Sequence, residues 1–82
     1  MIEKSTHIKI LFFGQLVEMI GAKELMVEGI TDIDTLKKYL HQQFPVLEQS
    51  KYLLAVDQEM ISDNRKLEDH NIVALMPPFS GG

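Results

Sequence analysis

Short apolar runs, separated by glycine, proline or polar stretches, predict a series of β-strands along the chain. The predicted strands are residues 7–13, 23–28, 53–56 and 72–76, with a further short piece around Met60 and Ile61. Alternation in the first strand places Ile8, Ile10 and Phe12 on one face. Leu11 and Phe13 then point to the other face.

A helix pattern lies between the second and third strands. Its apolar stripe recurs at spacings of three and four and consists of Ile33, Leu36, Leu40 and Phe44. The helix is predicted to begin at Thr31, which forms a capping box with Asp34, and to end at Pro45. Residues 15–20 predict a shorter helix that ends at Gly21.

This order of elements predicts an α+β fold. One amphipathic helix must cover one face of a mixed sheet of four to five strands, which is the β-grasp arrangement. Leu67, alone in a polar stretch, is expected to anchor that stretch to the core. We expect a single domain over residues 1–82, with a globular body at 7–76 and an extended tail at 77–82.

Size and composition narrow the class of protein. Eighty-two residues allow one core, and 45% hydrophobic with 24% charged residues argues against disorder. A net charge of −4 disfavours nucleic-acid binding. The longest apolar runs are too short to cross a membrane, and the first ten residues lack a signal-peptide core. We therefore expect a soluble, cytoplasmic protein that binds neither nucleic acid nor membrane.

Side chains that carry chemistry are scarce. The absence of cysteine excludes disulfides, thiolate metal sites and thiol nucleophiles. His7, His41 and His70 have no metal-ligand spacing, and no metal site is expected. Residues 57–64 lack the central glycine and terminal glutamate of a calcium loop. We expect that the chain is not an enzyme by itself and binds no cofactor.

The C-terminal end is the most informative segment. Pro77 and Pro78 end the last strand and start an extended tail, which can span roughly 20 Å at about 3.3–3.6 Å per residue. Gly81 and Gly82 have no side chains, so a narrow tunnel could accept them up to the carboxylate. An ATP-dependent partner could activate that carboxylate as an acyl-adenylate, and sulfide would then give a thiocarboxylate. The alternative is that the glycine pair is only a frayed end.

A docking surface is also predicted. If Val73 and Leu75 face the core, Ala74 and Met76 lie beside Phe13 on the uncovered face of the sheet. Met60 could join this partner-binding patch. Exposed apolar patches on small proteins mark interaction sites, although a small core could also wrap around the sheet edge.

Three stretches of the chain resemble one protein family. They are Ile10-Leu11-Phe12-Phe13-Gly14-Gln15, Leu54-Ala55-Val56-Asp57-Gln58 and Leu75-Met76-Pro77-Pro78-Phe79-Ser80-Gly81-Gly82. Together they resemble the molybdopterin synthase small (sulfur carrier) subunits, the MoaD-type ubiquitin-like family. The sequence departs from that family in two places. The turn at 69–71 commonly carries glycine there, and the residues before Pro77 are often aromatic.

The resemblance implies a specific role for the tail. An E1-like adenylyltransferase would use ATP to adenylate Gly82, and a sulfur donor such as a cysteine desulfurase system would supply the thiocarboxylate sulfur. The segment Pro77, Pro78, Phe79, Ser80 and Gly81 would thread into the large catalytic subunit of the synthase. Sulfur would pass there to cyclic pyranopterin monophosphate and form the molybdopterin dithiolene, while the large subunit supplies the catalytic residues.

Three other functions remain open. A sulfur carrier for thiamin thiazole synthesis has a similar fold and ending but typically lacks the two prolines. A ubiquitin-like modifier would instead form isopeptide bonds with protein lysines. A small acidic inhibitor of a basic partner would not need Gly81 and Gly82 at all.

Overall fold

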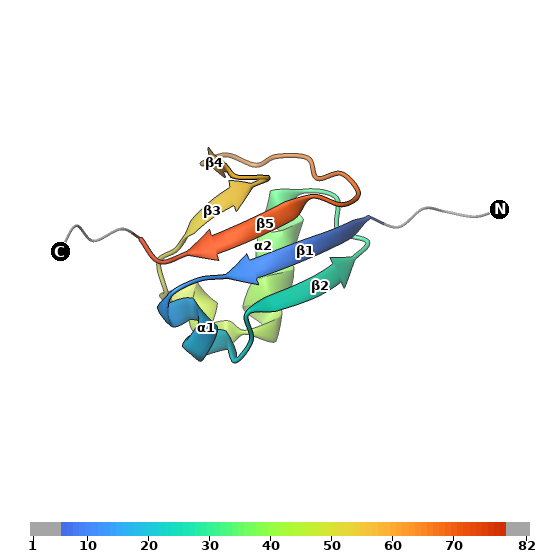
Figure 1. Cartoon of the computed structure of the whole chain (residues 1–82). Coiled ribbons are helices and arrows are strands. Elements are labelled where there is room, and N and C mark those ends of the chain that lie inside the picture. Colours follow the sequence, from blue (N-terminus) through green and yellow to red (C-terminus); the bar gives the residue numbers. More distant parts are fainter. Residues whose placement is uncertain (1–5, 79–82) are drawn as a thin grey trace.

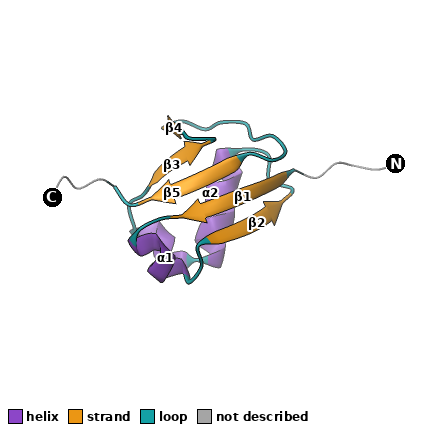
Figure 2. Cartoon of the chain, viewed as in Figure 1, coloured by secondary structure: helices purple, strands orange, loops and turns teal. Residues whose placement is uncertain are grey.

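The structure is a computed structural model and describes residues 6–78. In chain order its elements are β1 (His7–Phe12), α1 (Gln15–Ile20), β2 (Glu24–Glu28), α2 (Ile33–Gln43), the 3-10 helix η1 (Pro45–Gln49), β3 (Leu53–Val56), β4 (Glu59–Ile61) and β5 (Ile72–Met76). The strands form one layer and α2 lies across one face of it (Figures 1 and 2).

The sheet has five strands in the order β2-β1-β5-β3-β4. β1 and β5 are parallel, and every other pair in the sheet is antiparallel. The predicted α+β fold, a mixed sheet with one main helix, is therefore confirmed. Because β1 and β5 are parallel neighbours at the centre of the sheet, the residues that follow each of them leave the sheet at the same end (Figure 1).

The core lies between the sheet and α2. From β1 it receives the predicted face, Ile8, Ile10 and Phe12, which are at most 3% exposed. The α2 stripe is buried at its first three positions, whereas Phe44 is only partly buried and packs edge-on against Phe12. Leu67 is 2% exposed, so the predicted anchor of the polar stretch is confirmed.

The start of α2 corrects one prediction. Asp32, not Thr31, caps the helix, and its Oδ1 accepts a hydrogen bond from the Thr35 backbone N–H at 3.1 Å. Thr31 is engaged elsewhere, because its carbonyl accepts the Leu67 N–H at 2.8 Å. The hydrogen bonds from Thr35 and Asn64 lower the pKa of the Asp32 carboxyl. The backbone of Thr31 and Asp32 pairs with the 65–67 segment, and this pairing places the cap at Asp32, one residue after the predicted position.

The shorter elements agree closely with their predictions. α1 spans the predicted residues 15–20 and ends at Gly21, whose φ is +87° and whose N–H donates to the Val17 carbonyl. β1 is one residue shorter than predicted, because the chain turns into α1 after Phe13. β2 begins one residue later than predicted.

Candidate functional site

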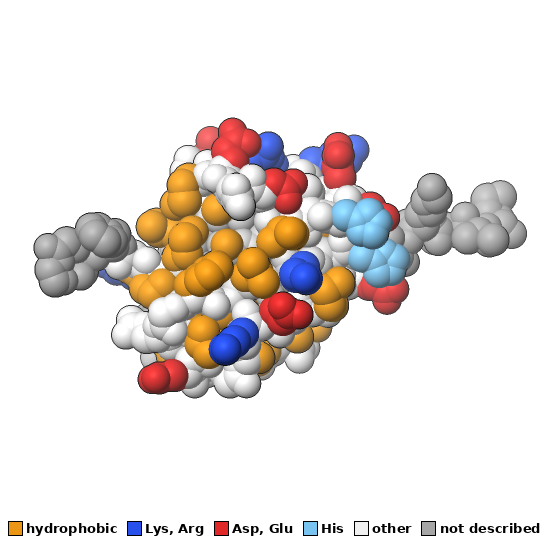
Figure 3. Space-filling view, viewed as in Figure 1, with side chains coloured by type: hydrophobic (Ala, Val, Ile, Leu, Met, Phe, Trp, Pro, Cys, Tyr) orange, Lys and Arg blue, Asp and Glu red, His pale blue; other side chains and the backbone are white. Residues whose placement is uncertain are grey.

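The face of the sheet opposite α2 carries a continuous apolar surface. No helix of residues 6–78 lies over this face, and Figure 3 shows hydrophobic side chains gathered over β1, β3 and β5. Strand pairing places Leu11, Ala74, Ala55 and Met60 in one row across four strands. We call this surface the open-face patch; its members are Leu11, Phe13, Leu53, Met60, Ile72, Ala74 and Met76, together with Ala55, which faces the same side but is only 4% exposed.

All four residues predicted to form a docking surface lie on this face. Phe13 is 45% and Met60 54% exposed, while Ala74 and Met76 are half-buried. Ala74 pairs with Leu11 on one side and with Ala55 on the other. The structure thus brings the four residues to one surface; their role in binding a partner stays a prediction.

The prediction missed other members of the patch. Ile72 shares a face with Ala74 and Met76 by simple alternation within β5, so the sequence already held that signal. Leu53 and Ala55 required the strand order, because they join the patch only through pairing with Met76 and Ala74.

A hollow of about 310 Å³ lies within the open-face patch. Leu11, Phe13, Ile72 and Ala74 line it together with the turn residues Asp57 and Gln58. The Asp57 carboxylate is held in place because it accepts hydrogen bonds from Asn71 Nδ2 at 2.6 Å and from the Ile72 N–H at 2.9 Å. The hollow is therefore apolar inside with a fixed polar edge, a shape that can receive an apolar side chain.

The root of the tail is held against the end of β1. The Phe13 N–H donates to the Leu75 carbonyl at 3.1 Å. Gly14 follows with φ +59°, and a Cβ on it would lie 2.8 Å from Cγ and 3.3 Å from Cδ of Pro77. A side chain at Gly14 would collide with the Pro77 ring, so this glycine lets the chain pass closely and sets where the tail leaves the body.

The remaining tail residues of the prediction, Phe79, Ser80, Gly81 and Gly82, lie outside the described residues. Pro78 is exposed, and Pro77 is half-buried against Gly14. The structure thus describes the point from which the predicted reactive end departs.

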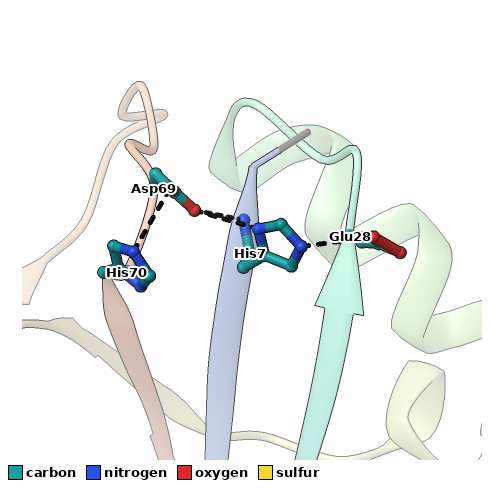
Figure 4. Close-up of polar contacts among 4 residues, drawn as sticks. All are labelled: His7, Glu28, Asp69 and His70. Carbon is teal, nitrogen blue, oxygen red and sulfur yellow. Dashed lines mark hydrogen bonds and ion pairs between the residues drawn. The ribbon is translucent and has the colours of Figure 1, made fainter. Parts of the chain in front are cut away.

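A polar cluster lies at the opposite end of β1 from the tail root (Figure 4). His7 contacts Glu28 through Nε2 and Asp69 through Nδ1, both at 3.2 Å, and His70 Nε2 lies 3.3 Å from Asp69. Hydrogen bonding from the His7 backbone N–H, followed by its ring, lowers the pKa of the Asp69 carboxyl. His7 begins β1, and the tail root follows the end of the parallel strand β5, so this cluster lies at the opposite end of the sheet from the tail root.

Residues 6–78 hold no group of three or more histidine or acidic side chains placed to bind a metal ion. None of the helices in this range has the length and apolar character needed to cross a membrane.

Comparison with known proteins decides the family. The model of the ThiS family matches residues 10–82. The chain belongs to the ThiS family. A molybdopterin synthase sulfur carrier subunit from Caenorhabditis briggsae is 36% identical over 81 residues, which cover 92% of this chain and 96% of that protein. The protein of the same name from Escherichia coli K12 is also 36% identical, over 92% of this chain and 99% of its own length.

These relatives confirm the resemblance found in the sequence. Solved structures of lower identity share the fold of this chain. Small archaeal modifier protein 1 from Methanosarcina acetivorans superposes with a TM-score of 0.79 at 20% identity, over 98% of this chain and all of that one. A complex of subunits 1 and 2 of the molybdopterin-converting factor from Helicobacter pylori contains a chain with a TM-score of 0.73 at 22% identity, over 94% of this chain and all of that one. At these identities the likeness establishes the ubiquitin-like β-grasp fold alone.

Proposed function

We propose that this chain is the sulfur carrier subunit of a molybdopterin synthase and carries sulfur on Gly82. The observation that supports this most strongly is the 36% identity to sulfur carrier subunits over nearly the whole chain. The Pro77-Pro78 and Gly81-Gly82 pairs supply the chemistry that such a role needs. The body would dock, and the tail would deliver its carboxylate to an active site elsewhere.

The proposed cycle begins with activation. A carboxylate oxygen of Gly82 attacks the α-phosphorus of ATP on an E1-like adenylyltransferase, and pyrophosphate leaves. A donor such as a cysteine desulfurase system holds sulfur as a persulfide, and a thiol reductant releases it as sulfide, itself becoming a disulfide. The sulfide then attacks the acyl carbon and displaces AMP. The product is a thiocarboxylate at Gly82, which differs from the starting chain by one sulfur in place of one oxygen.

Delivery would use the two parts of the candidate site together. The open-face patch buries apolar area against the large catalytic subunit, which compensates the cost of ordering the tail, about 1–2 kcal/mol per residue. The contact between Gly14 and Pro77 fixes the starting point of the tail. Each thiocarboxylate then gives one sulfur to cyclic pyranopterin monophosphate, held by the large subunit, and returns to a carboxylate by taking an oxygen from water. Two loaded chains are therefore needed to form one dithiolene.

In this proposal the chain is a donor and not a catalyst. Its three partners are the large synthase subunit, the adenylyltransferase and the sulfur donor, while ATP is used by the activating enzyme and no cofactor is bound by the chain. The cytoplasmic location predicted from the sequence stays a prediction.

The rival functions are weaker but share the fold. Likeness to small archaeal modifier proteins cannot favour conjugation to lysines, since it rests on fold alone. A thiamin thiazole carrier would typically lack the Pro77-Pro78 pair present here. An acidic inhibitor would leave the identity to sulfur carriers unexplained.

Intact-mass spectrometry tests the proposal. The full chain is incubated with ATP, a sulfur donor and its adenylyltransferase. We expect a mass gain equal to one oxygen-to-sulfur exchange, localised to Gly82 and absent from a chain lacking Gly81 and Gly82. Loaded chain mixed with the large subunit should then convert cyclic pyranopterin monophosphate. Loading without that conversion would point to another pathway, and isopeptide conjugates without loading would point to a modifier.

A further inference from the structure

A groove lies beside the tail root and adjoins the open-face patch, because Leu53 belongs to both. It has a volume of about 580 Å³ and is bordered by α2 and η1, by β3 and β4, and by Pro78. Apolar side chains form much of its wall, namely Leu47, Leu53, Leu54, Ile61 and Pro78. Pro78, the last described residue before the predicted reactive end, lines this groove, so the groove lies at the root of the tail.

The rim of the groove is positively charged on a negatively charged protein. Lys37 and Lys51 line it against a single acid, Glu48, whereas the whole chain carries −4. A neighbouring hollow of about 320 Å³ adds Lys38 to Lys37 on the same side of α2. Three of the eight basic residues of the chain thus gather here.

The polar floor of the groove is fixed by two rings. His41 Nε2 and the Tyr52 hydroxyl share a hydrogen bond of 2.7 Å, and the rings meet edge-on with centroids 5.9 Å apart. Both side chains are half-buried, and burial raises the pKa of Tyr52, so its hydroxyl stays protonated. The floor is therefore preorganised, and the positive charge of the groove comes from its lysines.

We infer that this groove binds an acidic peptide segment, bearing one apolar side chain, of the partner that receives the tail. The inference rests on the proposed function. Charge complementarity selects an acidic partner, since the lysines would repel a basic one and raise the rate of encounter with an acidic one. The apolar wall and the volume exceed what a lone phosphate needs, which favours a peptide over a small anion.

Charge reversal tests the inference in the full chain. Lys37→Glu with Lys51→Glu is compared with Arg65→Glu and Lys66→Glu, two basic residues that do not line the groove. Both double variants change the net charge equally. For the variant with Lys37→Glu and Lys51→Glu, we expect the Kd for a tail-receiving enzyme to rise at least tenfold. For the variant with Arg65→Glu and Lys66→Glu, the Kd should stay within twofold of wild type. The Kd of the wild-type chain should rise with salt concentration. Equal affinities of both variants for the large subunit and for the adenylyltransferase would overturn the inference.

A peptide probe separates this inference from the proposed function. Acetyl-Glu-Asp-Leu-Asp-Glu-amide is titrated into the isotope-labelled full chain, with a Lys-for-acid peptide and inorganic phosphate as controls. Shifts at Lys51, Tyr52 and His41 with the acidic peptide alone would support the groove. The inference would be overturned if phosphate caused equal shifts or if the acidic peptide caused none. It would also be overturned if deleting residues 79–82 caused the same shifts in the absence of peptide, because the shifts would then report on the tail and not on peptide binding. Thiocarboxylate formation measured on the same chain reports on the proposed function independently.

Discussion

The two ends of the β1–β5 strand pair carry different kinds of side chain. At the His7 end, polar side chains contact one another, with His7 between Glu28 and Asp69. At the other end Phe13 and Met76 leave apolar surface open to solvent, and Pro77 packs on Gly14. Polar groups that contact each other or water need no partner, whereas exposed apolar area gains free energy only when something covers it. We therefore expect the Phe13 end to bind a partner, whereas the polar side chains at the His7 end need none.

The largest expected effect is on docking. Phe13→Asp puts a charge into the open-face patch beside the hollow, so binding the large subunit would bury an unpaired carboxylate. We expect a loss of about 2 kcal/mol or more, roughly thirtyfold in Kd, measured by calorimetry. Thermal stability should hardly change, because the side chain is 45% exposed.

Met26→Asp is the matched control for this change. Met26 is 58% exposed on the same face. It lies on the edge strand β2, where it pairs with Lys9 of β1, and it is outside the patch. Its affinity should stay within about twofold of wild type. A comparable loss of affinity from both variants would mean that docking is not concentrated at the tail end.

The second effect concerns the tail root. Gly14→Ala and Gly21→Ala both place a side chain at positive φ. Gly21 is in the left-handed helical region, where this costs about 1–2 kcal/mol, whereas Gly14, with ψ −139°, lies outside that region in a conformation that adds backbone strain of its own. At Gly21 nothing lies within 4 Å of the added Cβ, while at Gly14 the Pro77 ring does. We expect Gly14→Ala to be the more destabilising in urea unfolding and also to slow sulfur transfer. Equal losses of stability, with transfer unchanged, would show that the Pro77 contact does not guide the tail.

This site illustrates what the sequence could predict. Alternation alone was sufficient for Phe13, Ala74 and Met76, because each strand has one face that must be buried. Ala55 needed the β3–β5 register, which no local pattern specifies. The approach of Gly14 to Pro77 likewise follows from the parallel pairing of β1 with β5, two strands at opposite ends of the chain.

The start of α2 shows a different limit of prediction. Thr31 and Asp32 are both good N-cap residues, so local preference cannot choose between them. The choice is made by the distant 65–67 segment, which pairs with the backbone at Thr31 and Asp32. Competing local signals were thus resolved by tertiary contacts, as was the β-strand order.

The third prediction concerns how the stability of the chain depends on pH through the polar cluster at the His7 end. Hydrogen bonds from His7 lower the pKa of Asp69 in the folded chain below its ordinary 3.8. The stabilisation is therefore fully present above the unfolded value and is lost as pH falls through the lower folded value. In urea unfolding from about pH 6 to pH 2, Asp69→Asn should be less stable than wild type, with the gap closing below that ordinary pKa. Asp69→Asn should not change the Kd for the large subunit. A loss of affinity would mean that the polar end also contributes to docking.

The smallest effect comes from the turn at the edge of the patch. Asp57 and Gln58 connect β3 to β4 with φ of +49° and +71°, and glycine is favoured at the second position of such a turn. Gln58→Gly should therefore stabilise the chain by up to about 1 kcal/mol in urea unfolding, since the strain of a side chain at positive φ is removed. The same change strips one polar wall from the hollow in the patch. If the apolar lining of Leu11 and Phe13 supplies the docking energy, the Kd for the large subunit should stay within about twofold. A gain in stability with a large loss of affinity would instead make this polar edge, which lies beside the start of β5 and away from the tail root, the part of the patch that a partner recognises.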